Sequence, residues 1–422
     1  MIQGQTRGAI TRILLFSVSL IAISSCILAP DLRTDFGLTE EEQLAQLTST
    51  GETSSFNDFI TSIYQAAPED KQALVDSFIH WADSTSGIPY IEDSTVYFLY
   101  AAGNASKVHV AGDFNGWAPG NAFNSVSGTN FFYRAYTFEM DARLDYKLVV
   151  DDAWILDPLN PNTCAGGYGP NSELSLPDYI QPPEIQEYDI PHGALNQTSF
   201  SDSIQGRTRN ITIYTPPGYE AGMLSYRSIY FLDGTEALQL GFAANVLDYL
   251  IHEALIPPVI AVFSDPTNRN SEYAYDMDFM DMFVSELVPW IDETYRTMPE
   301  PRNRAITGVS LGGLTSLLFT LNHPEVFGNC GAYSPAIWLG DLIGDYQNSP
   351  KQDTKIYMDA GTYEQSIHAA SMDLKQILDS KDWDYKWKVW HEGHSWGAWR
   401  AHLDESLTYF WPMHTTGIDE RY

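Results

Sequence analysis

The spacing of apolar residues changes along the chain, and each pattern predicts a different kind of structure. Between residues 56 and 84, apolar side chains recur at helical spacing until Gly87 and Pro89 break the pattern. From about residue 94 the period shortens to two, in short runs such as 96–100 that turn residues separate. Short alternating strands at this spacing are typical of a small β-sandwich, which we expect to end near residues 177–183.

The remainder of the chain alternates short apolar strands with helical stretches. Strands are predicted at residues 211–214, 229–232, 259–263, 305–307, 356–358 and 385–390. Helices are predicted at about residues 236–254, 278–296, 312–322 and 365–379. Because strands buried on both faces are apolar throughout, this order predicts an α/β fold with a mainly parallel sheet between helical layers.

The composition fits a folded protein with more than one domain. The 422 residues exceed what one ordinary core holds, and 44% of them are hydrophobic while 18% are charged. A formal net charge of −32 predicts a well-solvated acidic surface that repels a phosphate backbone, so no nucleic-acid partner is expected. A site for cationic substrates is the other interpretation of this charge, although no acidic cluster in the sequence singles one out.

The N-terminus has the character of an export segment. Arg7 and Arg12 supply positive charge, and residues 13–23 form an apolar stretch too short to span a bilayer as a helix. The sequence Ile-Ser-Ser-Cys that ends at Cys26 resembles the lipobox of bacterial lipoproteins, in which the signal peptidase cuts before the cysteine that carries the lipid. The resemblance implies a membrane anchor in the cell envelope, on the periplasmic or outer-membrane face. An ordinary signal peptide is the alternative.

Few residues are left that could form disulfides or hold a metal. Cys164 and Cys330 lie far apart in the sequence, so we expect both to be free. His391 and His394 are three residues apart, a spacing that could suit zinc. The surrounding sequence favours a catalytic base instead, and no metal site is expected.

The clearest chemistry lies in the sequence Gly-Val-Ser-Leu-Gly at residues 308–312. A predicted strand ends at Thr307 and a helix rich in small residues follows, which is the strand–turn–helix setting of a nucleophile elbow. Gly308 and Gly312 leave room around a strained turn that points the Ser310 hydroxyl outward. Ser310 is therefore the candidate nucleophile, and a glycine-rich turn without chemistry is the alternative.

A serine hydroxyl needs a base, and the base needs a group that orients it. In this kind of fold the acid and then the histidine follow the serine along the chain. His394 lies in a loop after the strand 385–390, where Gly393 lets the chain bend, so it is preferred to His391 as the base. Glu364 lies just beyond an earlier strand and is the candidate acid, with Asp359 as the alternative.

A tetrahedral intermediate also needs an oxyanion hole. One donor should be the backbone N–H of Leu311, directly after the nucleophile, and the other should come from the loop after an earlier strand. The sequence Leu-Asp-Gly-Thr at residues 232–235 fits that loop, so Gly234 or Thr235 is the second candidate. A simple β-turn is the alternative interpretation of these residues.

These segments together resemble the bacterial putative-esterase family, over about residues 190–412. The family includes enterochelin esterases, xylanase-associated feruloyl and acetyl-xylan esterases, and mycolyltransferases. Beyond the elbow, the resemblance rests on residues 214–219, 269–273, 286–289, 323–328 and 334–336, on a Gly-Thr-x-acid motif ending at Glu364, and on Glu-Gly-His ending at His394. The feruloyl branch commonly has Asp at the acid position, and Glu392 replaces the first glycine of the family's Gly-Gly-His motif.

Residues 90–180 resemble the immunoglobulin-like module that precedes many of these esterases and also occurs in glycogen-branching enzymes. The match rests on Gly-Asp-Phe-Asn-Gly-Trp at residues 112–117 and on residues 146–158. In the glycogen-binding relatives, the positions that match Trp117, Lys147 and Trp154 contact sugar, which indole can do by stacking. The alternative is that the module keeps this pattern only to hold its own fold and to dock on the catalytic domain.

Together, the patterns and the resemblance predict an α/β-hydrolase fold behind an N-terminal immunoglobulin-like β-sandwich. The expected divisions are residues 1–26 (signal peptide and lipobox), 27–88 (tether and helical segment), 89–185 (β-sandwich) and 186–422 (esterase domain). The expected activity is cofactor-free serine hydrolysis of acyl or feruloyl esters of polysaccharides, or of siderophore-type lactones. An acyltransferase on the same fold and a non-catalytic surface glycan-binding lipoprotein are the rival functions, and the oligomeric state is left open.

Overall fold

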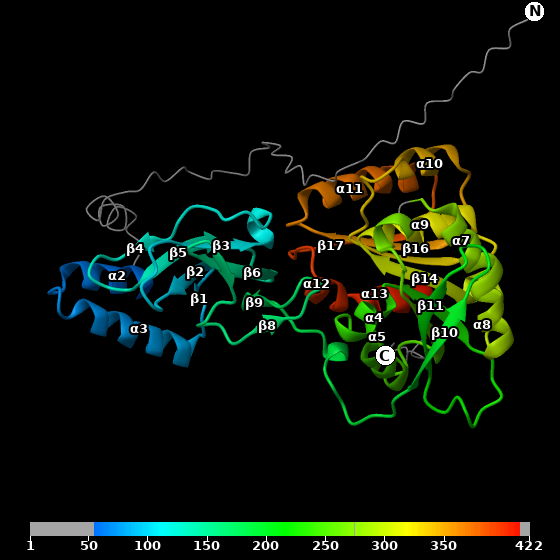
Figure 1. Ribbon diagram of the computed structural model, residues 1–422, viewed down its shortest axis with the longest axis horizontal. Coiled ribbons are helices and arrows are strands. Elements are labelled where there is room, and N and C mark those ends of the chain that lie inside the picture. The colour runs from blue at the N-terminus through cyan, green and yellow to red at the C-terminus, as the bar shows by residue number, and fades with distance from the viewer. Residues whose placement is uncertain (1–54, 274, 414–422) are drawn as a thin grey trace, which may run out of the picture.

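The computed structural model describes residues 55–273 and 275–413, which form two lobes lying side by side (Figure 1). The N-terminal lobe holds two helices and two small sheets, and the C-terminal lobe holds one large sheet between helices. The expected signal peptide, Cys26 and most of the expected tether lie outside the described residues. Within the described part of the chain, no helix combines the length and the apolar character needed to cross a bilayer.

The N-terminal lobe is built in three layers. Helices α2 (Ser55–Gln65) and α3 (Lys71–Thr85) pack on one face of the sheet β1–β2–β5–β4, and a second sheet, β3–β6–β9–β8 with β7 beside β6, packs on the other. The alternation of side chains along β2 produces these layers, because Tyr97 packs with the helices whereas Phe98 packs with the second sheet. We call the two sheets, residues 90–175, the two-sheet unit.

The strands of the two-sheet unit are β1 (Tyr90–Glu92), β2 (Thr95–Tyr100), β3 (Val108–Gly112), β4 (Asn124–Ser125), β5 (Phe132–Thr137), β6 (Arg143–Val150), β7 (Ala153–Ile155), β8 (Thr163–Cys164) and β9 (Asn171–Ser175). All the pairs within it are antiparallel.

The large sheet has eight strands in the order β10–β11–β13–β12–β14–β15–β16–β17. The pairs β10–β11 and β11–β13 are antiparallel, and every pair from β13–β12 to β16–β17 is parallel, so the sheet is mainly parallel as the sequence predicts. The strands are β10 (Ala194–Ser201), β11 (Thr208–Thr215), β12 (Arg227–Leu232), β13 (Val259–Ser264), β14 (Arg304–Val309), β15 (Asn329–Tyr333), β16 (Lys355–Gly361) and β17 (Asp384–Trp390).

Helices cover both faces of this sheet, because successive residues of its strands point to opposite sides. Along β12, Tyr230 packs with α7 to α11, whereas Phe231 packs with α4, α5, α12 and α13. A π-helical turn at Phe283–Leu287 joins α7 to α8. The helices are α4 (Gly234–Gln239), α5 (Ala243–His252), α6 (Arg269–Glu272), α7 (Met277–Met282), α8 (Val288–Thr294), α9 (Leu311–Asn322), α10 (Leu342–Asn348), α11 (Gln365–Ser380), α12 (Trp396–Arg400) and α13 (Leu403–Phe410).

The parallel strands end at a common edge of the sheet, and the candidate residues follow these ends. Ser310 comes directly after β14, Glu364 follows β16, and His394 follows β17. Ligands of open α/β sheets bind outside the carboxyl ends of the strands, so this edge is where a site is expected.

Candidate active site

Ser310 occupies the turn between β14 and α9. Its backbone has a φ of 56° and a ψ of −116°, a strained conformation for a residue with a side chain. A Cβ atom on Gly308 would lie 2.6 Å from the carbonyl carbon of Gly312, so only glycine fits at that point of the turn. The strand, the strained turn and the helix together make the geometry in which a nucleophile hydroxyl stands out from the sheet edge.

An ion pair that was not predicted from the sequence holds this turn against the neighbouring loop. Asp233, directly after β12, accepts two hydrogen bonds from Nε of Arg269, at 2.9 and 3.0 Å, and one from its Nη2 at 2.8 Å. The Nη2 atom of Arg269 also donates to the Val309 carbonyl at 3.2 Å, and the Tyr273 hydroxyl accepts the Asp233 N–H at 3.0 Å. Arg269 therefore ties the elbow to the loop that begins α4.

His394 and Glu364 are brought together across the loops after β17 and β16. Nδ1 of His394 is hydrogen-bonded to Oε1 of Glu364. The other carboxylate oxygen of Glu364 accepts from the Gly361 N–H at 2.6 Å and from the Ser334 hydroxyl at 2.8 Å. A carboxylate at Nδ1 favours the tautomer with its proton there, which leaves Nε2 of His394 as a proton acceptor.

Ser334, directly after β15, connects these groups. Its hydroxyl donates to Glu364 and accepts from Nε1 of Trp399 at 2.9 Å. The Trp399 ring meets the imidazole of His394 edge-on, with ring centroids 4.8 Å apart. Trp399 therefore contacts both the histidine and the serine that holds the acid, a role that the sequence pattern did not indicate.

The segment around Ser334 is also bonded to the elbow. The Ser310 N–H donates to the Tyr333 carbonyl, and the Ala336 N–H donates to the Ser310 carbonyl, both at 2.9 Å. Because residues 333–336 contact the elbow on one side and Glu364 on the other, Ser310, Glu364 and His394 lie at one edge of the sheet.

The two alternatives to these residues have other partners. Asp359 accepts from the Ser334 N–H at 3.1 Å and from the Tyr357 hydroxyl at 2.9 Å. Nδ1 of His391 lies 2.6 Å from Oδ1 of Asp141, in the two-sheet unit. The acid that contacts His394 is therefore Glu364, and His391 and His394 face separate carboxylates rather than a common metal position.

The oxyanion candidates do not all have free donors. The Thr235 N–H donates to Oδ1 of Asp265 at 2.7 Å, and the Thr235 hydroxyl donates to Oδ2 at 2.5 Å. This corrects the prediction for Thr235, whose amide a neighbouring carboxylate already engages. Gly234 and Leu311 are the first residues of α4 and α9, where N–H groups have no acceptor within the helix, and they remain the candidates.

The three predicted sugar-contacting residues lie on the two-sheet unit. Trp117 is half-buried, and its Nε1 donates to Oδ1 of Asp113 at 3.0 Å. Trp154 is 48% exposed and is paired with Val149 of β6. Because Lys147 and Val149 are two positions apart in β6, their side chains lie on the same face of the sheet, and Trp154 shares that face. The structure thus places Trp154 and Lys147 together and gives Trp117 a separate hydrogen-bonding partner.

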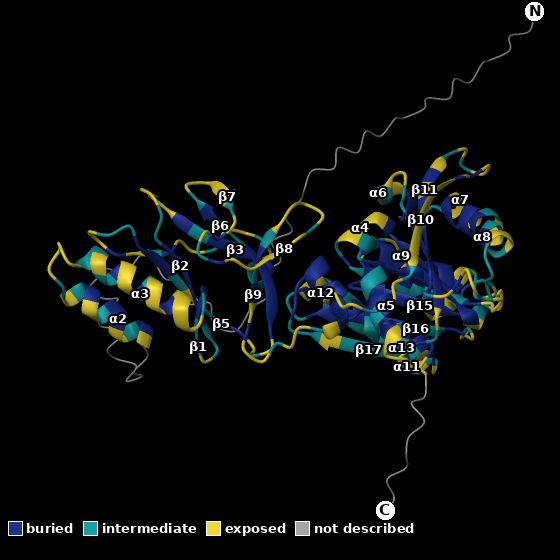
Figure 2. Cartoon of the chain, turned by 90° about the horizontal axis from the view of Figure 1, so that it is seen from below, coloured by how far each residue is buried: buried dark blue, intermediate teal, exposed yellow. Residues whose placement is uncertain are grey.

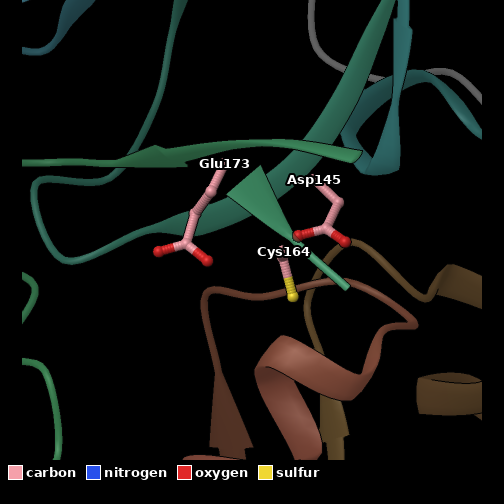
Figure 3. A group of neighbouring side chains, drawn as sticks. All are labelled: Asp145, Cys164 and Glu173. Carbon is pink, nitrogen blue, oxygen red and sulfur yellow. The ribbon is translucent and has the colours of Figure 1, made fainter. Parts of the chain in front are cut away.

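One group of possible metal ligands was not predicted from the sequence: Asp145, Cys164 and Glu173 have ligand atoms within 4.8 Å of one another (Figure 3). However, the Arg143 guanidinium contacts both carboxylates, with Nη1 2.8 Å from Asp145 and Nη2 2.5 Å from Glu173. Burial also raises the pKa of the Cys164 thiol, which disfavours the thiolate that a metal requires. The group is an ion-pair cluster around an arginine. Cys164 and Cys330 are both free, as expected.

We expect the buried Asp359 to make stability depend on pH. Burial, opposed by the nearby charge of His402, raises the pKa of Asp359 from 3.8 to about 7. The folded state therefore binds a proton that the unfolded state releases between about pH 4 and pH 7, and stability present below this window is lost as the pH rises through it. The melting temperature of Asp359→Asn should fall less steeply across this window than that of the wild type. Parallel curves would show that Asp359 does not titrate this way.

The C-terminal lobe matches a known protein family. Residues 201–410 match the family model described as "Putative esterase". The strained serine elbow and the paired histidine and glutamate at the sheet edge are features of a hydrolase of carboxylic esters. The matched residues make up most of the C-terminal lobe, which we call the catalytic lobe, and they belong to the esterase family that this model defines.

Individual relatives are more distant. An endo-1,4-beta-xylanase/feruloyl esterase of Xylanibacter ruminicola is 28% identical over 233 residues, which cover 52% of this chain and 31% of that protein. An iron(III) enterobactin esterase of Escherichia coli O6:H1 is 23% identical over 309 residues, covering 70% of this chain and 76% of the relative. The match to the xylanase/feruloyl esterase thus spans about a third of its length.

Solved structures show the same fold. The ferric enterobactin esterase from Salmonella typhimurium superposes with a TM-score of 0.69 at 21% identity, over 79% of this chain and 98% of that one. That share of the chain is larger than the C-terminal lobe alone, so the likeness extends into the N-terminal lobe. The predicted α/β-hydrolase fold is confirmed, whereas the immunoglobulin-like character of the two-sheet unit stays a prediction.

Proposed function

We propose that this protein is a serine esterase in which Ser310, His394 and Glu364 act as nucleophile, base and orienting acid. The observation that carries the proposal is the hydrogen bond between His394 Nδ1 and Glu364, at the sheet edge where the Ser310 elbow stands. A serine hydroxyl becomes reactive only when a base takes its proton, and a carboxylate at the far nitrogen holds that base in the required tautomer.

The reaction follows from these positions. Oγ of Ser310 attacks the ester carbonyl carbon while Nε2 of His394 takes the hydroxyl proton. The carbonyl oxygen becomes an oxyanion, which the N–H groups of Leu311 and Gly234 stabilise. When the intermediate collapses, the leaving alcohol takes the proton from His394 and an acyl-serine remains. Water then attacks the acyl group while His394 accepts its proton. As the acyl–oxygen bond breaks, His394 returns this proton to Oγ of Ser310, and the acid is released.

We further propose that the ester substrate carries an aromatic group. Trp338 is 64% exposed, and it lies two residues beyond Ala336, whose N–H is bonded to the Ser310 carbonyl. An exposed indole on the segment that is bonded to the elbow offers a surface on which an aryl ring can stack. The relatives named as feruloyl esterase and enterobactin esterase also act, by their names, on feruloyl and catecholate compounds, which contain such rings.

A substrate panel tests the proposal. Purified protein should be assayed on p-nitrophenyl acetate, methyl ferulate, acetylated xylan and a catecholate trilactone. Hydrolysis of methyl ferulate or of the trilactone is expected. If acetylated xylan were the only natural-type ester cleaved, the aromatic specificity would be wrong, although the esterase would stand. If no ester were cleaved, the non-catalytic glycan-binding alternative would replace the proposal.

The aromatic preference leads to a prediction for Trp338. Trp338→Ala should raise KM for methyl ferulate by roughly fivefold, about 1 kcal/mol of lost stacking, and leave KM for p-nitrophenyl acetate nearly unchanged. Trp81→Ala is the control, because Trp81 is 43% exposed on α3 in the other lobe. Equal KM changes for both esters would show that Trp338 does not read the aromatic ring.

A further inference from the structure

We propose that the two-sheet unit is part of the catalytic machinery, and that its Arg143 is a positioning residue for the loop that carries His394. The inference rests on the proposed function, since it takes His394 as the base. Its physical basis is a set of contacts between the two lobes that converge on residues 391–397.

The backbone of Arg143 contacts the chain just before His394. Arg143 is the first residue of β6, and its N–H donates to the His391 carbonyl at 3.1 Å. Arg143 and Glu392 form a parallel β-bridge. Backbone pairing from the two-sheet unit therefore continues onto the catalytic lobe and fixes the residues that enter the His394 loop.

The guanidinium of Arg143 contacts the chain just after His394. Its Nη1 donates to the hydroxyl of Ser395 at 3.1 Å, and the same hydroxyl accepts the Ala398 N–H at 3.3 Å. Ser395 is thus the N-cap of α12, the helix that carries Trp399. Figure 2 shows α12 buried at the junction of the lobes. Arg143 therefore holds the loop on both sides of the catalytic histidine.

Close packing supports the same role. A Cβ atom on Gly393 would lie 2.1 Å from Cγ of Asp113, and one on Gly397 would lie 2.1 Å from Nη2 of Arg143. Oδ2 of Asp113 accepts the Asp145 N–H at 2.8 Å, while its Oδ1 accepts from Trp117. The Gly-Asp-Phe-Asn-Gly-Trp motif thereby faces the His394 loop, which gives it a use that does not involve sugar.

The charges around Arg143 keep its side chain in place. Arg143 is 1% exposed and lies between the carboxylates of Asp145 and Glu173. Glu173 also faces a second arginine, Arg400, whose Nη2 lies 3.7 Å from Oε2 of Glu173. Removing one member of a buried ion pair leaves an uncompensated charge and is strongly destabilising. A variant at Arg143 therefore needs a control that matches this loss of stability.

The test compares Arg143→Met with Arg304→Met. Arg304 is also buried and ion-paired, to Asp292 at 2.6 Å, but it begins β14 at the edge opposite Ser310. At a temperature where both variants are folded, Arg143→Met should lose roughly 10- to 100-fold in kcat with KM within about threefold, the size expected for a displaced catalytic group. Arg143→Lys should recover part of the loss, and Arg304→Met should keep near wild-type kcat.

Ser395→Ala keeps the test decisive if Arg143→Met does not fold, because it removes the Arg143 contact and the cap of α12 without disturbing the ion pairs. We expect it to lower kcat and to weaken the low-field proton resonance of the His394–Glu364 hydrogen bond. Unchanged kcat and an unchanged resonance in Ser395→Ala, or in a folded Arg143→Met, would overturn the inference. The resonance does not depend on turnover, so the inference can be judged even if no ester is hydrolysed, a result that would instead refute the proposed function.

Discussion

Replacing Ser310 by alanine should lower kcat on every ester substrate by about 10⁴- to 10⁶-fold, because the proposed reaction passes through an acyl group on the Ser310 oxygen. The fold should survive, since the elbow is held by backbone bonds to residues 333–336 and by the Arg269 contact to Val309, none of which uses the Ser310 hydroxyl. Initial rates and labelling by a fluorophosphonate measure the effect.

Ser316→Ala is the matched control for Ser310→Ala. Ser316 lies in the same helix, is fully buried, and donates its hydroxyl to the Gly312 carbonyl at 2.8 Å. Its loss removes a serine hydroxyl close to the elbow without removing the nucleophile, so activity should stay near that of the wild type. Substantial hydrolysis by Ser310→Ala, or labelling that persists in it, would mean that another residue is the nucleophile.

Glu364→Gln should lower kcat by about 10²- to 10⁴-fold, because a neutral amide no longer holds the Nδ1 proton and the wrong histidine tautomer can form. Asp359→Asn should cost less than about tenfold, since Asp359 bonds Ser334 and Tyr357 and does not contact His394. Steady-state kinetics on one ester, run on both variants, compares the two carboxylates directly. A greater loss for Asp359→Asn would reverse the assignment of the acid.

The sequence predicted those parts of the fold whose side-chain periodicity is strong. The apolar runs that became β12, β13, β14 and β16 are buried in the structure, and the helical spacing at residues 56–84 corresponds to α2 and α3. The central strand β15 was missed, because its sequence Asn-Cys-Gly-Ala-Tyr has no run of strongly apolar residues. Pairing with β14 and β16 makes it a strand, which is a tertiary effect.

The sequence also predicted part of the candidate site, namely the residues that directly follow predicted strands. Ser310, Glu364 and His394 follow predicted strands, so a common sheet edge could be inferred for them. The hydrogen bonds of Ser334 and Trp399 could not be predicted from the sequence, because they depend on which side chains face the loop after folding. Arg143 and Ser395 are 252 positions apart, and nothing in either local sequence indicates that the two lobes meet there.

The location of the His394 loop has a consequence for how activity appears during folding. The elbow forms within the catalytic lobe, whereas residues 391 and 392 are paired to the first residue of β6 in the other lobe. A chain whose lobes have not yet docked would carry the proposed nucleophile, Ser310, while the loop of the proposed base, His394, would lack its contacts to the other lobe. Esterase activity would then develop only after the two lobes have docked. A variant that disrupts the interface between the lobes would lose activity even while each lobe stays folded.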